Sequence, residues 1–368
     1  MRIVLLAHNL RVAGGLSVGK NIVTTLPDIA PMHDYLIVVP AGCDYPEFEG
    51  QANVTMLVAP SMGLLKRARW ERSVLRPQIT QFQPDWIWGL GNLGLKNPPC
   101  KQAVLFHDTH LIYPESHFAT ESFVYKLKKR FLRFLLRRCL PKTDIVFCQT
   151  QTSRNRFAKV YNRDIDTIAV CPNAVSAFCQ TDTISTPESL KPFDDRFKLF
   201  VLTKCYGHKN IQTILDTYNE FRDELKDTLC VLTIEANQHP IAPGLLQRIE
   251  DERLGNVILN VGPLDQTILS SYYHSCDALL LPTLLESFSG TYLEAMNFHV
   301  PILTSDLDFA HDVCGDAALY FDPHSTLAMR DAILQCKTDA ALRDDLIRRG
   351  QDRLQSLFRS WDEILRDA

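Results

Sequence analysis

Two glutamates between positions 279 and 296 have the spacing and the setting of a ligand site. The apolar run that ends at Pro282 predicts a buried strand, Glu286 falls in the loop that follows, and Ser289 is placed to cap a helix that carries Glu294. In one continuous helix the chain between them would turn about 800°, so the carboxylates would not share a face. With Glu286 in the loop, both can bond one ligand near the helix N-terminus, at the carboxyl edge of the sheet. An acidic cap and one surface glutamate would give the same spacing.

Two lysines earlier in the chain could meet the negative charge of such a ligand. Lys204 and Lys209 lie directly after a predicted strand at 198–202. Two ammonium groups on one strand-to-helix loop suit a diphosphate, which offers delocalised charge and many acceptor oxygens. Without the neighbouring motifs, they would be ordinary surface lysines.

Gly89, Gly91 and Gly94 have the form of a dinucleotide-binding fingerprint after a predicted strand. That fingerprint requires a helix to begin at its third glycine, whereas the two prolines at 98–99 forbid one. We therefore predict a turn at the strand's carboxyl edge, where Asn92 lines a cleft on the acceptor side, and no nicotinamide cofactor.

Gly14, Gly19 and Lys20 come close to a phosphate-binding P-loop, but Asn21 stands where the Mg²⁺-binding hydroxyl residue belongs. An NTPase is disfavoured on that ground. The pair Gly14-Gly15 is retained as a flexible connection between the first strand and a helix, where bare backbone N–H groups can approach a diphosphate.

Metal-binding and redox patterns are weak. Asp164 and Asp166, and likewise Asp306 and Asp308, form D-x-D pairs that 43 acidic residues produce by chance. The 11 cysteines include no C-x-x-C pair and are interpreted as reduced packing residues. We predict no metal site and no cofactor.

Length and composition predict two α/β domains. The chain has 368 residues, of which 46% are hydrophobic and 22% charged, and it has no apolar run long enough to span a bilayer. We expect no signal peptide. A cytoplasmic location is expected.

Short β-rich runs separated by helix-length intervals predict parallel sheets of doubly wound βαβ units. The runs lie at 2–7, 35–39, 86–88, 103–106, 144–148, 198–202, 229–234, 256–260, 278–281, 301–304 and 318–321. A linker is placed at 172–192, and a closing amphipathic helix contains Trp361.

Charge divides unevenly along the chain. Through Val175 there are 22 Lys and Arg against 13 Asp and Glu, whereas the remainder has 17 against 30. The first half is therefore expected to face an anionic partner, while the whole-chain balance disfavours nucleic acid. A basic amphipathic helix at 126–138 is either packed on the core with a solvated face or in contact with anionic lipid, at the inner face of the membrane.

Taken together, these residues resemble glycosyltransferase family 4, a group of retaining, nucleotide-sugar-dependent enzymes with the GT-B fold. The resemblance covers nearly the whole chain, and its elements occur in the family's order: Gly14-Gly15, His107-Asp108, Cys171-Pro172-Asn173-Ala174, Lys204 and Lys209, the E-x7-E pair Glu286 and Glu294, and the closing-helix residues Phe358 and Trp361. It implies two Rossmann-like domains that face a central cleft. The acceptor-side domain is expected over 1–175, completed by a helix at about 350–368, and the nucleotide-sugar-binding domain over 190–349.

The resemblance also implies a reaction, the transfer of a hexose from a nucleoside diphosphate sugar to a glycan or lipid-linked acceptor in polysaccharide or glycoconjugate biosynthesis. UDP-glucose is the expected donor. Departure of the diphosphate develops charge. The groups expected to meet it are Lys204, Lys209, the Gly14-Gly15 backbone and the helix N-terminus at Gly290 and Thr291.

The remaining roles fall on both predicted domains. Glu294 is expected to bind the ribose, and Glu286 with the backbone of Phe288 and Ser289 the sugar hydroxyls, while His107 approaches the sugar from the first domain. No enzymic nucleophile is assigned, because the resemblance implies front-face attack, in which the leaving phosphate accepts the proton. The alternative for position 107 is a histidine with only a structural role.

The sequence departs from the family pattern in three places. Lys204 replaces the usual Arg, 235–237 replace a glycine-rich turn, and Asn297, Phe298 and His299 stand where a small residue and Gly are usual. Two alternatives stay open: a sugar-nucleotide-binding protein without turnover, and a GT-B epimerase. A phosphorylase is disfavoured because no lysine is placed for a pyridoxal Schiff base.

Overall fold

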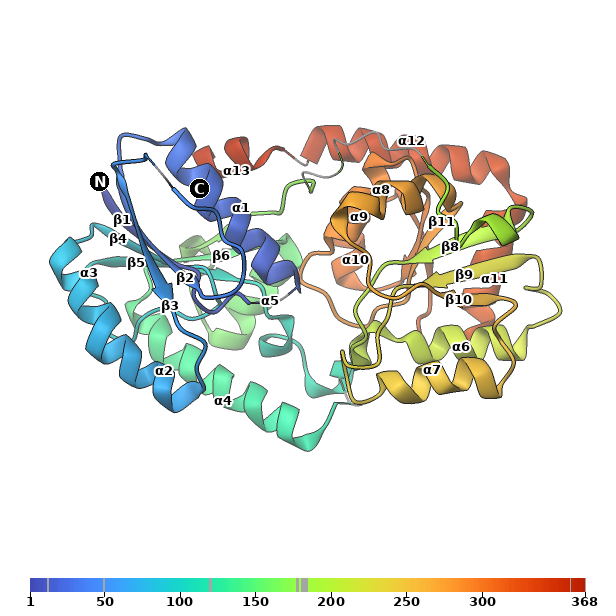
Figure 1. Cartoon of the computed structure of the whole chain (residues 1–368), viewed down its shortest axis with the longest axis horizontal. Coiled ribbons are helices and arrows are strands. Elements are labelled where there is room, and N and C mark those ends of the chain that lie inside the picture. Colours follow the sequence, from blue (N-terminus) through green and yellow to red (C-terminus); the bar gives the residue numbers. More distant parts are fainter. Residues whose placement is uncertain are drawn as a thin grey trace. The chain divides into compact units, whose positions relative to one another are not determined.

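The computed structural model describes residues 1–11, 13–48, 50–118, 121–176, 179, 185–357 and 359–367. They form two compact units, each with its own sheet and helices (Figure 1). The first unit comprises Met1–Tyr113, Phe123–Asn173 and Arg359–Ala368, and the second comprises Pro114–Ser122 and Ala174–Phe358. Phe358 lies outside the described residues.

The first unit is built on a parallel sheet with the strand order β3-β2-β1-β4-β5-β6-β7. Its strands are β1 (Arg2–Leu6), β2 (Asp34–Pro40), β3 (Val54–Ala59), β4 (Trp86–Gly89), β5 (Lys101–Phe106), β6 (Ile145–Cys148) and β7 (Ile168–Val170). Its helices are α1 (Ala13–Ile29), α2 (Leu64–Trp70), a π-helical turn (Glu71–Leu75), α3 (Arg76–Phe82), α4 (Phe123–Cys139), α5 (Gln151–Tyr161) and α13 (Trp361–Asp367). Because the strands are parallel, the loops after β1, β4 and β5 all emerge at one edge of the sheet.

The second unit contains a parallel sheet in the order β10-β9-β8-β11-β12-β13. Its strands are β8 (Phe197–Val201), β9 (Thr228–Leu232), β10 (Ile258–Asn260), β11 (Ala278–Leu281), β12 (Ile302–Ser305) and β13 (Ala318–Phe321). Its helices are α6 (Ile211–Glu220), α7 (Ala242–Asp251), α8 (Gln266–Ser275), α9 (Gly290–Asn297), α10 (Asp308–Cys314), α11 (Thr326–Thr338) and α12 (Ala340–Leu357).

Successive side chains of the strands in the second sheet point to opposite faces, and both faces are packed, which explains why these strands are continuous apolar runs in the sequence. Phe200 of β8 packs into one core cluster with α8, α9 and α10, whereas its neighbours Leu199 and Val201 pack into another with α6, α7 and α11. Leu279 and Leu280 of β11 divide in the same way. Both faces of the sheet are therefore buried, as is typical of doubly wound folds, and the predicted α/β class is confirmed.

The structure adds short elements that the sequence analysis did not identify. β3 and β7 are edge strands. The sequence of β3, Val-Thr-Met-Leu-Val-Ala, is largely apolar although most of its residues are exposed or half-buried, and the sequence analysis overlooked this run. Short 3₁₀ helices lie at Thr109–Leu111, Glu115–Phe118, Leu140–Lys142, Ile165–Thr167, Lys191–Phe193 and Gly207–Lys209. Where one closing helix was expected, α12 packs on α9 in the second unit and α13 on α1 in the first.

All 11 cysteines are free, and most are buried, which agrees with their interpretation as packing residues. Within the described residues, no helix is long and apolar enough to cross a bilayer. The same residues contain no group of three or more His, Cys, Asp or Glu side chains placed to hold a metal ion.

Candidate functional site

The loop between β11 and α9 brings a glutamate and a lysine together across 77 sequence positions. Glu286 lies in this loop, and its Oε1 atom accepts a hydrogen bond from Nζ of Lys209. The two side chains are 16% and 18% exposed, so the pair is partly withdrawn from water while still reachable by a ligand. An ammonium group has three donors. Lys209 can therefore hold Glu286 and still donate to a phosphate oxygen.

Hydrogen bonds fix the two loops that carry this pair. The amide of Leu284 donates to the carbonyl oxygen of His208 at 2.7 Å, and the hydroxyl of Thr283 donates to the same oxygen at 3.2 Å. Ser305, at the end of β12, in turn donates to the carbonyl oxygen of Thr283 at 2.7 Å. The loop after β8 is thereby joined to the loop after β11, its neighbour in the sheet.

The N-terminus of α9 presents backbone donors beside this loop. Ser289 occupies the N-cap position, but its hydroxyl donates to Oγ1 of Thr291 at 3.2 Å and makes no capping bond to the backbone. The predicted N-cap position of Ser289 is therefore confirmed, but its side chain does not make the expected capping hydrogen bond. The first N–H groups of α9, at Gly290 and Thr291, receive no side-chain cap from Ser289 and lie at the positive end of the helix dipole, which favours anions.

Glu294 lies one turn into α9 and is buried. Its Oε1 accepts from the hydroxyl of Ser176 at 2.8 Å, and its Oε2 accepts from the hydroxyl of Tyr273 at 2.9 Å. Burial raises the pKa of this carboxyl, and the two hydrogen bonds oppose the shift. A Cβ placed on Gly290 would lie 3.8 Å from Oε1, so the carboxylate sits beside the start of the helix. The sequence analysis did not identify Ser176 or Tyr273.

Two departures from the family pattern support this arrangement. Phe298 stacks on the Tyr273 ring with centroids 5.0 Å apart. His299 takes φ +60°, the left-handed conformation that glycine adopts most readily. The expected glycine geometry is thus present, although the residue is a histidine.

Lys204 has a different setting from Lys209. It lies on the loop after β8, its side chain is exposed, and it forms no ion pair with the residues that the structure describes. The neighbouring amide of Cys205 donates to Oε1 of Gln238 at 2.7 Å, which ties this loop to the residue that follows the segment 235–237. The structure does not join Lys204 to the pair formed by Lys209 and Glu286.

In the first unit, His107 lies at the end of β5 against α1. A Cβ on Gly15 would lie 3.3 Å from its Nε2. The Nδ1 atom is buried and has no hydrogen-bond partner among the described residues. Burial lowers the pKa of His107 to about 4, although the neighbouring Asp108 favours the charged form. The imidazole is therefore neutral near pH 7.

Asn92 positions the backbone around His107. Its Oδ1 accepts from the amides of His107 and Asp108 at 2.7 and 2.8 Å, with Asn92 itself at φ +67°. The sequence analysis expected Gly14-Gly15 to form a flexible connection between the first strand and a helix. This expectation is wrong, because α1 begins at Ala13 and both glycines lie in its first turn. Their N–H groups remain at a helix N-terminus.

The rejected glycine motifs have packing roles. A Cβ on Gly94 would lie 2.5 Å from the side chain of the fully buried Gln102, and one on Gly91 would lie 2.8 Å from Cβ of Asn9. A Cβ on Gly19 would meet Leu10 at 2.6 Å. These glycines permit close packing, which explains why both motifs occur without their nucleotide-binding surroundings.

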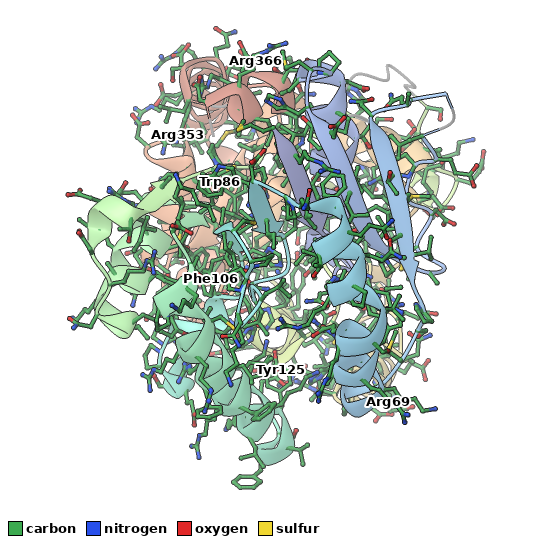
Figure 2. All side chains as sticks on the ribbon, turned by 90° about the vertical axis from the view of Figure 1, so that its left-hand side faces the viewer. Arg69, Trp86, Phe106, Tyr125, Arg353 and Arg366 are labelled. Carbon is green, nitrogen blue, oxygen red and sulfur yellow. The ribbon has the colours of Figure 1, made fainter. Side chains whose placement is uncertain are left out.

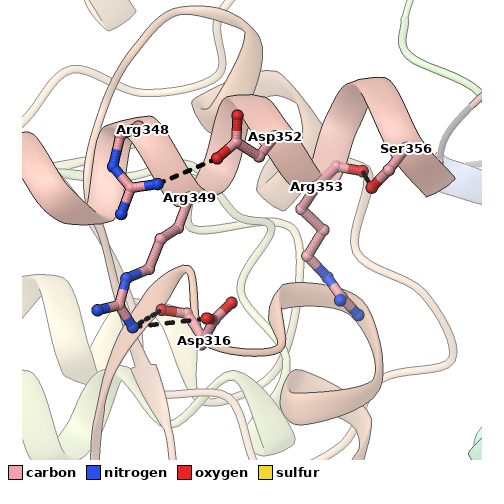
Figure 3. A pocket seen from close by; sticks show the side chains of 6 residues that line it. All are labelled: Asp316, Arg348, Arg349, Asp352, Arg353 and Ser356. Carbon is pink, nitrogen blue, oxygen red and sulfur yellow. Dashed lines mark hydrogen bonds and ion pairs between the residues drawn. The ribbon is translucent and has the colours of Figure 1, made fainter.

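A cavity of about 530 Å³ along α12 is lined by charged side chains that already pair with one another (Figure 3). Arg348 bonds Asp352 at 3.2 Å, and Arg349 lies 3.5 Å from the carboxylate of Asp316. Arg353 donates to carbonyl oxygens at the end of α10. None of the predicted site residues lines this cavity.

Models of two glycosyltransferase families match the two halves of the chain. Residues 182–353 match the family model described as glycosyl transferases group 1, and residues 29–177 match glycosyltransferase family 4. The chain is 25% identical over 322 residues to the O-antigen chain mannosyltransferase RfbU of Salmonella typhimurium, covering 84% of this chain and 83% of that protein.

Solved structures share the fold over the whole chain. Sucrose-phosphate synthase from Thermosynechococcus elongatus superposes with a TM-score of 0.76 at 14% identity, covering 100% of this chain and 97% of that one. Anabaena Alr3699/HepE in complex with UDP-glucose gives a TM-score of 0.74 at 14% identity, covering 100% and 98%.

Proposed function

The chain belongs to glycosyltransferase family 4 and has the two-domain GT-B fold, and from that premise we propose the reaction that it catalyses. A hexose passes from a nucleoside diphosphate sugar to a hydroxyl group of a glycan or lipid-linked acceptor, in polysaccharide or glycoconjugate biosynthesis. The bond from the anomeric carbon to the diphosphate oxygen breaks, and a bond to the acceptor oxygen forms on the same face of the sugar. The leaving phosphate takes the proton of the acceptor hydroxyl.

The contact between Lys209 and Glu286 carries this proposal. It joins a cation and a carboxylate in one half-buried position, on the loop that leads into the N-terminus of α9. Lys209 and Lys204 stabilise the charge that develops on the departing diphosphate, together with the helix N-terminus. Glu286 orients hydroxyl groups of the sugar, and Glu294 accepts from those of the ribose.

The sugar is proposed to be mannose, because the curated relative RfbU is named a mannosyltransferase. The UDP-glucose expected from the sequence is the competing donor, and HepE was solved with that compound. The reaction is proposed to need no metal, because the lysines and the helix dipole can balance the leaving group's charge.

A panel of UDP- and GDP-sugars, with and without acceptor glycans, tests the reaction by mass spectrometry of the products. We expect one donor to give a new glycoside, with its anomeric configuration retained in the NMR spectrum. Inverted product would refute retention. Epimerised donor without acceptor, or binding without any product, would replace transfer by the epimerase or the binding protein.

The basic helix α4 is proposed to dock on anionic lipid, which would bring a lipid-linked acceptor to the enzyme. Figure 2 shows α4, which carries the labelled Tyr125, at the edge of its unit. Large apolar side chains on α4 are exposed by about half or more; they are Phe123, Val124, Leu127, Phe131 and Phe134. Exposed cations accompany them at Lys128, Arg130, Arg137 and Arg138. This combination of apolar and basic exposed residues is typical of interfacial helices.

Two other cations of α4 bind within the unit. Lys129 pairs with Asp108 at 2.7 Å, and Arg133 donates to the carbonyl oxygens of His110 and Tyr113 at 2.7 and 2.6 Å. One face of the helix is thus anchored within the unit, and the other is exposed. A charge-reversal test must therefore spare Lys129 and Arg133, whose replacement would disturb the fold.

Sedimentation with phosphatidylglycerol vesicles at low salt tests this docking. The double variant Lys128→Glu/Arg137→Glu should lose salt-sensitive binding, at about 1 kcal/mol for each cation near the surface. Leu127→Ser/Phe131→Ser should weaken binding that salt does not remove. Lys66→Glu, an exposed lysine on α2, is the matched control. Absence of vesicle binding by the unmodified protein would show that α4 is scaffold only.

A further inference from the structure

A second cavity, of about 250 Å³, lies at the carboxyl edge of the first unit's sheet. Its walls come from the segment after β1, from the end of β3 with the loop that follows, and from α2. They include His8, Asn9, Arg11, Arg67 and Trp70. This position is where open parallel sheets bind ligands.

The wall of the cavity contains buried polar atoms that have no partner among the described residues. These are Nδ1 of His8, a residue that is only 6% exposed, and Oδ1 of Asn9. The other ring nitrogen of His8, Nε2, lies 3.3 Å from a carboxylate oxygen of Glu71. Buried polar groups in folded proteins are nearly always paired, so unpaired ones in a cavity wall point to a ligand.

The cavity has a positive charge. Arg67 donates from Nε to Glu71 at 2.8 Å, which balances one guanidinium with one carboxylate. Among the residues that the structure describes, Arg11 donates to the carbonyl oxygens of Ala41 at 3.4 Å and of Pro60 at 3.1 Å and pairs with no carboxylate. Guanidinium groups bind the oxygens of carboxylates and phosphates with well-defined geometry.

The rest of the wall suits a small ring. Trp70 is half-buried, and its ring centroid lies 6.0 Å from that of His8. Ala59, Pro60 and Met62 supply an apolar surface beside it. The volume is below the roughly 300–1,000 Å³ of sites for drug-sized ligands, which restricts the occupant to about one sugar residue.

We propose that this cavity binds a sugar residue that carries an oxyanion, either a carboxylate or a phosphate. Arg11 and Arg67 bind the anionic group, the unpaired atoms of His8 and Asn9 bond hydroxyl groups, and the ring packs on Trp70. This assignment rests on the proposed function, in which the sugar belongs to the acceptor and the enzyme extends an anionic glycan.

Direct binding to the full-length protein, without donor or turnover, tests the proposal. Isothermal titration is run with glucuronic acid, glucose 6-phosphate, glucose and inorganic phosphate. We expect one of the two anionic sugars to saturate the protein, at least about tenfold more tightly than glucose or phosphate alone. Preference for glucuronic acid identifies a carboxylate, and preference for glucose 6-phosphate identifies a phosphate.

Two variants and a control locate the site. Arg11→Ala and Arg67→Ala should each weaken binding about tenfold, whereas Arg69→Ala, on an exposed position of the same helix (Figure 2), should leave it unchanged. If neither anionic sugar binds the unmodified protein, the proposal is wrong whether or not any variant folds. Phosphate binding as tightly as glucose 6-phosphate would also overturn it. A protein that binds the sugar and transfers nothing would refute the proposed function and leave the cavity's assignment standing.

Discussion

Replacing Lys209 tests whether its contact with Glu286 serves the donor or only the fold. In Lys209→Met, the ammonium that meets the diphosphate is lost, and Glu286 remains 16% exposed without its partner. A hydrogen bond to a charged group contributes about 1.5–3 kcal/mol, so kcat/KM for the donor should fall roughly 10- to 150-fold. Because the pair is not fully buried, the protein should still fold.

A second set of variants separates an effect on catalysis from an effect on folding stability. Glu286→Gln keeps the shape of the side chain and removes its charge, and the double variant completes a cycle that isolates the coupling. Steady-state kinetics at varied donor concentration and thermal melts are measured for each protein. Lys191→Ala is the matched control, since Lys191 forms an exposed pair with Glu188 in the same unit; exposed pairs contribute little. Full donor activity in Lys209→Met, with only a lowered melting temperature, would refute the role of Lys209 at the diphosphate.

Four further results are expected. Lys204→Ala should also lower kcat/KM, by about 10- to 150-fold, but with no change in melting temperature because its side chain is exposed; unchanged kinetics would remove Lys204 from the site. Transfer should persist in excess EDTA, and a complete loss that Mn²⁺ restores would revive a metal-bound D-x-D. His299→Gly should raise the free energy of unfolding by up to about 1 kcal/mol in a urea titration, because it relieves a left-handed histidine; a lower stability would contradict the strain. Burial lowers the pKa of His107 from 6.5 to about 4, so the folded state binds fewer protons than the unfolded one between these values. Its stabilising effect is complete above about pH 6.5 and is lost as the pH falls toward 4, and His107→Gln should flatten that part of the stability profile, which a denaturant series at several pH values measures.

The apolar runs of the second unit predicted β8 and β11 well, because strands buried on both faces need apolar side chains at every position. The same reasoning applies to the edge strand β3, whose residues are apolar at every position but Thr55 although Val58 is exposed, and the sequence analysis overlooked it. The interpretation of 89–94 as a turn rather than a dinucleotide fingerprint was also available from sequence, because proline cannot continue a helix there.

The sequence by itself determined the order of the family's motifs, and with it the fold class and the chemical types of the site residues. Tertiary structure decided which of those residues meet. Lys209 contacts Glu286 because their strands, β8 and β11, are neighbours in the sheet, while Lys204 remains exposed on the same loop. Ser176 and Tyr273 reach Glu294 from segments that share no motif with it. Periodicity reports local conformation, whereas contacts between distant segments depend on how the sheet orders its strands and how the helices pack on them.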